Sequence, residues 1–249
     1  HFKGSIDLTI INLQRVLNWL NIRRGSSLPK TLRKINFISR LNITRKQLQL
    51  LGMKLLIDNT RLSGAAAIAL KSRPSFGLTA IVDRINLDNY FGKSHSKETQ
   101  NISLNQQSSQ ESGQQKSQLE NQSKLISTLS SLGKFDANID LKIKKINFKG
   151  KKLRDLNLSG TLHDAKLNLR KLTIGEFVGA NFAAKGQLYN LDKIPSAENF
   201  QIKAKTEYIG PFLKFVKFKS KLNPKRLGTV TLKTIINSNL LQPSIRSTI

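Results

Sequence analysis

The stretch from Ala137 to Leu188 alternates apolar and polar residues, and this period of two constrains the fold more than any other feature. One alternating run covers 153–162, a polar turn follows at 163–166, and a second break at Gly175–Glu176 precedes a run that ends at Leu188. Alternation of this kind is typical of a strand with one apolar face that is shielded from water, which we call its dry face. The sequence therefore predicts a meander of antiparallel strands whose apolar face needs a cover.

Strand-like runs also occur outside this stretch, and only a few helical patterns accompany them. Asn12 is a plausible N-cap for a helix that begins at Leu13 and ends near Arg23–Gly25, and further short helices are expected at 119–132 and 212–216. The fold class is therefore mainly β, with antiparallel strands and a few short helices. The additional strands are predicted at 2–10, 35–43, 48–57, 62–70, 76–82, 200–208 and, as the last strand, from 230.

Residues 93–124 differ in kind, because Ser, Gln, Asn, Lys and Glu dominate them. Such a segment buries too little apolar surface to offset its ordering entropy, so we predict a disordered polar linker or loop. It divides the chain into a β-repeat over 1–92 and a second, truncated β-repeat over 125–249. The linker carries almost no net charge, so the positive charge of the chain lies in the folded remainder.

The two β-repeats match in pattern. The segment 13–22 corresponds to 209–218, the turn 28–32 corresponds to 223–227, and Ile35 and Phe37 then correspond to Val230 and Leu232. Each copy reads as strand, short helix, Pro-Lys turn and strand. One such unit cannot bury its own apolar face, so repeats of this kind usually stack along an axis.

The formal net charge is +27, from 42 Lys and Arg against 15 Asp and Glu. Such a charge attracts polyanions, including nucleic acids and anionic lipid headgroups. A bias toward Lys, Asn and Ile together explains it equally well. There is no apolar run near the ~20 residues of a membrane-spanning helix and no signal-peptide pattern. Because the chain begins with His, we expect a piece of a longer protein.

No arrangement of residues predicts catalysis, a metal site or a cofactor. The chain has no Cys, and its three His are scattered through a terminus, the linker and a turn. Asp136 and Asp140 would lie about 13 Å apart on one strand, farther than the closer carboxylate geometries allow. Ser63–Gly64 lacks the flanking glycine of a nucleophile elbow. We therefore expect a non-enzymatic protein.

Several phrases occur in a characteristic order along the chain: Gly4–Leu8 before Leu17–Leu20, then Asp58–Gly64, Phe135–Leu141, Leu153–Leu156 and Gly186–Leu188. In this order they resemble the AsmA family of Gram-negative bacteria, over most of the chain outside 93–124.

The resemblance implies an elongated, curled, antiparallel sheet of the repeating β-groove type. It also implies a periplasmic protein that an N-terminal helix, absent from this sequence, anchors to the inner membrane. The functions implied are outer-membrane assembly, phospholipid transport between membranes and regulation of protein targeting to the membrane. The polar insertion at 93–124 is longer than this pattern leads one to expect.

The dry face has two possible covers, a second sheet packed as a sandwich or a ligand held in a groove. The resemblance favours the groove, with lipid acyl chains as ligands and Lys and Arg at the rim for anionic headgroups. The alternatives are an ordinary sandwich core, a basic module for nucleic acid or another polyanion, and an envelope scaffold. Nucleic acid is not expected, since few aromatic residues are placed to stack bases. The predicted groove lining is Leu62, Ala66, Ile68, Leu70, Leu156, Leu158, Leu162, Phe182, Ala184 and Leu188.

Overall fold

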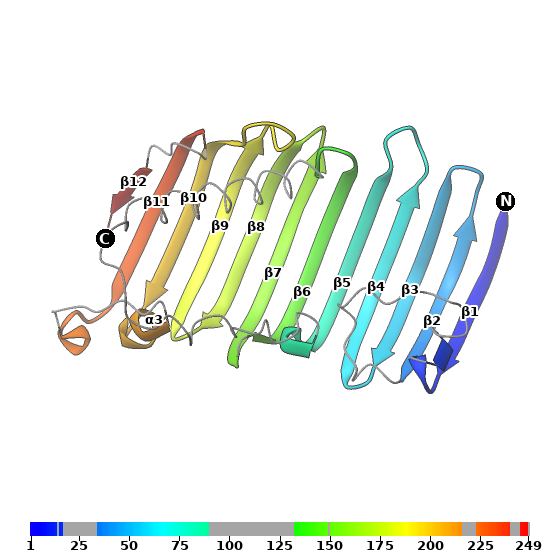
Figure 1. The fold of residues 1–249 in the computed structure, drawn as a ribbon, viewed down its shortest axis with the longest axis horizontal. Coiled ribbons are helices and arrows are strands. Elements are labelled where there is room, and N and C mark those ends of the chain that lie inside the picture. Colours follow the sequence, from blue (N-terminus) through cyan, green and yellow to red (C-terminus); the bar gives the residue numbers. More distant parts are fainter. Residues whose placement is uncertain are drawn as a thin grey trace, which may run out of the picture.

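The computed structural model describes residues 1–13, 15–16, 34–89, 132–148, 150–215, 223–239 and 245–248. These residues form one open twelve-stranded sheet in which the strands lie in sequence order, with β1 and β12 at opposite edges (Figure 1). The predicted mainly β fold is therefore confirmed. The strands are β1 Phe2–Ile10, β2 Ile35–Ile43, β3 Gln47–Ile57, β4 Thr60–Ala69, β5 Ser75–Asn86, β6 Asp136–Phe148, β7 Lys151–His163, β8 Lys166–Phe177, β9 Ala180–Tyr189, β10 Ser196–Thr206, β11 Val230–Asn239 and β12 Ile245–Thr248.

Every neighbouring pair is antiparallel except β5 and β6, which run parallel. The chain therefore leaves β5 at one end of the strands and enters β6 at the other. The antiparallel meander predicted over 137–188 is confirmed by β6–β9. The prediction of an antiparallel sheet for the whole chain missed the parallel pair β5–β6, which we call the parallel seam. The predicted linker 93–124 lies outside the described residues.

Hairpin turns account for most of the other boundaries. The predicted turn after β7 is present, with Asp164 and Ala165 both at positive φ, as a tight twisted turn requires. The predicted break at Gly175–Glu176 is wrong, because β8 continues to Phe177 and the turn is Val178–Gly179. The last strand was also missed, since β12 follows Pro243 and pairs with β11.

The described residues include three complete short helical elements: η1 Leu87–Asn89, α3 Gly210–Phe215 and η2 Pro224–Arg226. Asn12 caps the first turn after β1, since its Oδ1 accepts a hydrogen bond from the Arg15 N–H at 3.1 Å. Most of the helix predicted from Leu13 to near Arg23–Gly25, and most of the one predicted over 119–132, lie outside the described residues. Among the residues described, no helix is long and apolar enough to cross a membrane.

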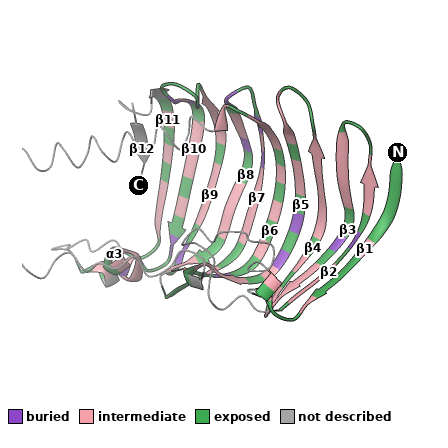
Figure 2. Cartoon of the chain, turned by 45° about the vertical axis from the view of Figure 1, so that its right-hand side comes forward, coloured by how far each residue is buried: buried purple, intermediate pink, exposed green. Residues whose placement is uncertain are grey.

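The strands bend along their length, and α3 lies on the side toward which they bend (Figure 2). Its Phe215 ring meets Phe177 edge-on with centroids 5.1 Å apart, and its Phe212 ring lies 5.9 Å from Phe182. A second small cluster sits at the opposite ends of the strands, where Leu191, fully buried, packs with Leu162 and Ala165. Both contacts lie on the apolar side of the sheet.

Candidate functional site

The strand register determines which side chains share a face, because residues directly opposite each other on paired strands point to the same side. One unbroken line of partners crosses eleven strands, from β1 to β11, and every member is apolar. We call it the apolar row. It consists of Leu8, Phe37, Leu55, Leu62, Val82, Ile143, Leu156, Ile174, Phe182, Ala204 and Leu232.

Nine of the ten predicted lining residues lie on the same face as the apolar row. Leu62, Leu156 and Phe182 belong to the row itself. The other six occupy neighbouring rows in the same phase: Ala66, Ile68, Leu158, Leu162, Ala184 and Leu188.

Leu70 is the exception among the predicted lining residues. It follows the last residue of β4, and 62 % of its surface is exposed. Its backbone N–H donates to the Lys46 carbonyl at 2.7 Å, which fixes the loop that leaves the strand. It therefore lies beyond the end of β4 rather than within a row.

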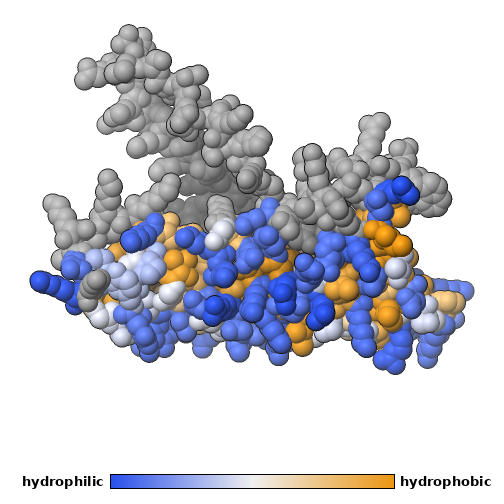
Figure 3. All heavy atoms as spheres, turned by 90° about the horizontal axis from the view of Figure 1, so that it is seen from below, coloured by the Kyte–Doolittle hydropathy of each residue, from blue (hydrophilic) through white to orange (hydrophobic). Residues whose placement is uncertain are grey.

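The apolar face is only partly covered by the described residues. All twelve strands belong to one sheet, so the described strands provide no second sheet to make a sandwich. Of the apolar row only Val82 is buried, while Leu8 is exposed and the rest are intermediate. Viewed from the strand ends, hydrophilic side chains cover much of the molecule, and hydrophobic ones are visible between them (Figure 3).

An ionic cluster clamps the parallel seam at one end. Arg73, just before β5, donates from Nε to Asp136 at 2.7 Å and from Nη1 to Asp164 at 3.2 Å. Asp136 begins β6 and also contacts the His163 ring at 3.0 Å. Burial by itself raises the pKa of Asp136, but hydrogen bonds from the Asp164 N–H, Arg73 and His163 outweigh it and lower that pKa.

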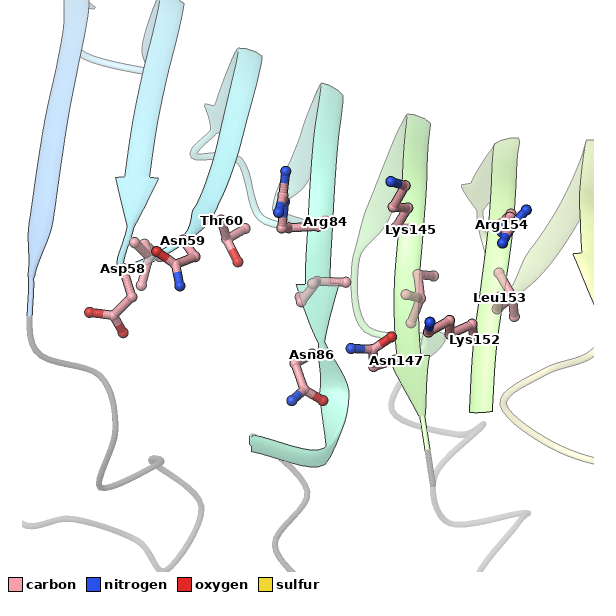
Figure 4. Close-up of a pocket in the computed structure, with 13 residues that line it drawn as sticks. Asp58, Asn59, Thr60, Arg84, Asn86, Lys145, Asn147, Lys152, Leu153 and Arg154 are labelled. Carbon is pink, nitrogen blue, oxygen red and sulfur yellow. The ribbon is translucent and has the colours of Figure 1, made fainter. Parts of the chain in front are cut away.

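A basic pocket of about 540 Å³ occupies the other end of the strands (Figure 4). Arg84, Lys145 and Arg154 lie side by side on β5, β6 and β7, with Lys152 beside them and the β3–β4 turn forming the remaining wall. The sequence places lysines close together at 144–145 and 149–152. It had no signal that Arg84, about sixty residues earlier, joins them.

Within the described part of the chain, no group of three or more His, Cys, Asp or Glu is arranged to hold a metal ion. No family model, curated protein or solved structure matches this chain. The site is therefore interpreted from its own residues.

Proposed function

We propose that this chain carries lipid acyl chains on its apolar face, as a non-enzymatic segment of an AsmA-like protein of the cell envelope. The observation that carries the proposal is the apolar row, which is unbroken over eleven strands of an open sheet. Neighbouring strands lie about 4.8 Å apart, so ten steps give a lane of roughly 48 Å. A lane of this kind suits hydrocarbon, which needs no hydrogen bonds.

The dimensions support acyl chains as the ligand. One leaflet of a bilayer holds its chains within about 15 Å, half of a ~30 Å hydrocarbon core. The lane is about three times that length. With its neighbouring rows it forms one contiguous apolar surface, and contiguous apolar surfaces on proteins often mark binding sites. Phospholipids are the substrate class proposed, and diffusion along the lane is the mechanism proposed.

The family resemblance suggests where in the cell this activity takes place. We propose a periplasmic location, with an anchor in the inner membrane supplied by a segment outside this sequence. Anionic headgroups would then meet the Lys and Arg side chains at the strand ends. Transport of phospholipid for outer-membrane assembly follows from these proposals.

The direct test is mass spectrometry of lipids extracted from the purified chain, with a detergent-washed soluble β-protein as control. Phospholipid in stoichiometric amount is the expected result. Phe182→Asp puts a charge in the apolar row, and Leu158→Asp puts one in the neighbouring row. Each should remove most of the lipid, because a carboxylate in hydrocarbon is strongly unfavourable.

The matched control is Asn181→Asp, which adds the same charge one residue away. Asn181 is exposed and points to the opposite face, paired with Lys205. Circular dichroism melts establish that each variant is folded. A lipid-free, monodisperse wild-type chain would mean that its dry face is already covered, and a scaffold role would then replace lipid transport. Equal lipid loss in Asn181→Asp and Phe182→Asp would also contradict the proposal.

A further inference from the structure

Three cations occupy directly opposed positions on three neighbouring strands. Lys145 is the register partner of Arg84 on β5 and of Arg154 on β7. Like charges directly opposite each other in a sheet are destabilising. The sheet therefore holds an unfavourable arrangement at this point, and Figure 4 shows the three side chains lining one pocket.

These cations point away from the apolar face. The adjacent line of partners is Ile85, Ile146, Leu153 and Phe177, and the Phe177 ring packs against α3 on the apolar side. Alternation slips by one residue here, because Lys144 and Lys145 are both exposed between Ile143 of the apolar row and the buried Ile146. The cation positions are next to the Ile85–Phe177 line along each strand, and successive side chains point to opposite faces, so the cations lie on the polar face. The cations are therefore separate from the apolar row, although Ile85, Ile146 and Leu153 also line the pocket. An inference from the cations goes beyond lipid transport.

Among the described residues, carboxylates pair with the two outer cations, Arg84 and Arg154. Asp83 lies 3.4 Å from Arg84, and Glu176 lies 3.3 Å from Arg154. Lys145, at the centre, makes no ion pair with any residue that the structure describes, and the same holds for Lys152.

The rest of the lining supplies hydrogen-bonding groups rather than opposing charge. Asn86, Asn147 and Lys152 form the next row of partners, and Asn59 and Thr60 come from the β3–β4 turn. The one carboxylate that lines the pocket, Asp58, already accepts a hydrogen bond from the Lys34 N–H at 3.0 Å through Oδ1. The lining thus combines four cations with side-chain amides, a hydroxyl group and the apolar residues Ile57, Ile85, Ile146 and Leu153.

We propose that this pocket binds a phosphate ester. A phosphate group carries up to two negative charges and several acceptor oxygens, which match lysine ammonium and arginine guanidinium donors. A pocket of about 540 Å³ exceeds the size of a single phosphate ion and leaves room for the esterified group. The phosphate relieves the repulsion between the three opposed cations.

Isothermal titration calorimetry of the whole chain at low salt tests the proposal with two probes. Glycerol 3-phosphate represents a free phosphate ester, and dihexanoyl phosphatidic acid represents a lipid headgroup. We expect Lys145→Gln to weaken the binding of at least one probe by about tenfold or more, since it removes the central charged donor. Binding of both through Lys145 indicates recognition of phosphate alone, and binding of only the second indicates a headgroup site.

The matched control is Lys142→Gln, on the same strand and face, whose register partners Ile81 and Asn157 are uncharged. It removes the same charge and should leave binding nearly unchanged. Without ligand, Lys145→Gln should melt at or above the wild-type temperature because repulsion is relieved, but it should gain less stability from the ligand. No binding of either probe, or equal weakening by both substitutions, would overturn the proposal. Neither result depends on whether lipid occupies the apolar face.

Discussion

Replacing Gly64 with alanine should force β4 and β5 apart. Gly64 lies opposite Ala80, which is only 1 % exposed, on the apolar face. A Cβ added at Gly64 would overlap the Thr79 carbonyl oxygen and lie 2.9 Å from the Ala80 Cα. These are backbone atoms, so no side-chain rotation relieves the clash. Overpacking of this kind typically costs about 1–3 kcal/mol.

The same hairpin offers an internal control at Gly77. A Cβ there would meet only the Ala67 Cβ at 3.8 Å, an ordinary contact, and neither glycine has a positive φ. Gly77→Ala should therefore stabilise the chain by about 0.4–1 kcal/mol through the lower entropy of its unfolded state. The two substitutions are chemically identical, so their difference isolates the close approach of the strands.

Thermal melts followed by circular dichroism measure this difference. For a chain of this size each kcal/mol corresponds to roughly 2–4 °C, so Gly64→Ala should melt below Gly77→Ala by several degrees. Equal melting temperatures would show that the β4–β5 spacing can relax without cost. The reasoning from close approach would then be refuted.

Two further predictions concern the ends of the strands. Because hydrogen bonds lower the pKa of Asp136, its ionised form stabilises the fold above the ordinary Asp pKa of about 3.9, and this contribution is lost as the pH falls through the lowered pKa. Asp136→Asn should lower the free energy of unfolding by about 1 kcal/mol at pH 7 and flatten the dependence of melting temperature on pH between 7 and 3. If the melting temperature of the variant falls with pH as steeply as that of the wild type, the ionic cluster around Asp136 does not stabilise the fold. Phe212→Ala should cost about 1–2 kcal/mol, since Phe212 is half-buried against Phe182, and a melt identical to wild type would show that α3 does not stabilise the sheet.

Much of the apolar face was predictable because the phase of a strand is local information. Alternation around Leu158 or Phe182 determines which residues share a face, whatever strand lies beside them. Nine of the ten predicted lining residues consequently lie on one face. The break near Gly175 failed because that glycine was taken for a turn, whereas the turn forms at Val178–Gly179.

The basic pocket was not predictable because it depends on pairing between distant segments. Arg84 and Lys145 become neighbours only through the parallel alignment of β5 and β6. Sequence alone favoured antiparallel neighbours throughout. The choice between groove and sandwich was not predictable for the same reason. Alternation along one strand shows that its apolar face must be covered, but it does not show what covers it.

The parallel seam links these observations, because its two ends differ electrostatically. At one end Arg73 pairs with Asp136, while at the other Arg84 and Lys145 face each other as like charges. Parallel pairs are slightly less stable per residue than antiparallel ones, so these end effects matter more at the seam than elsewhere. A phosphate bound in the pocket neutralises the unfavourable end. By linkage, a ligand that binds only when β5 and β6 are paired stabilises the seam by an amount that grows with its concentration relative to its Kd. Occupancy of the polar-face pocket should therefore affect how firmly the two halves of the apolar lane are joined.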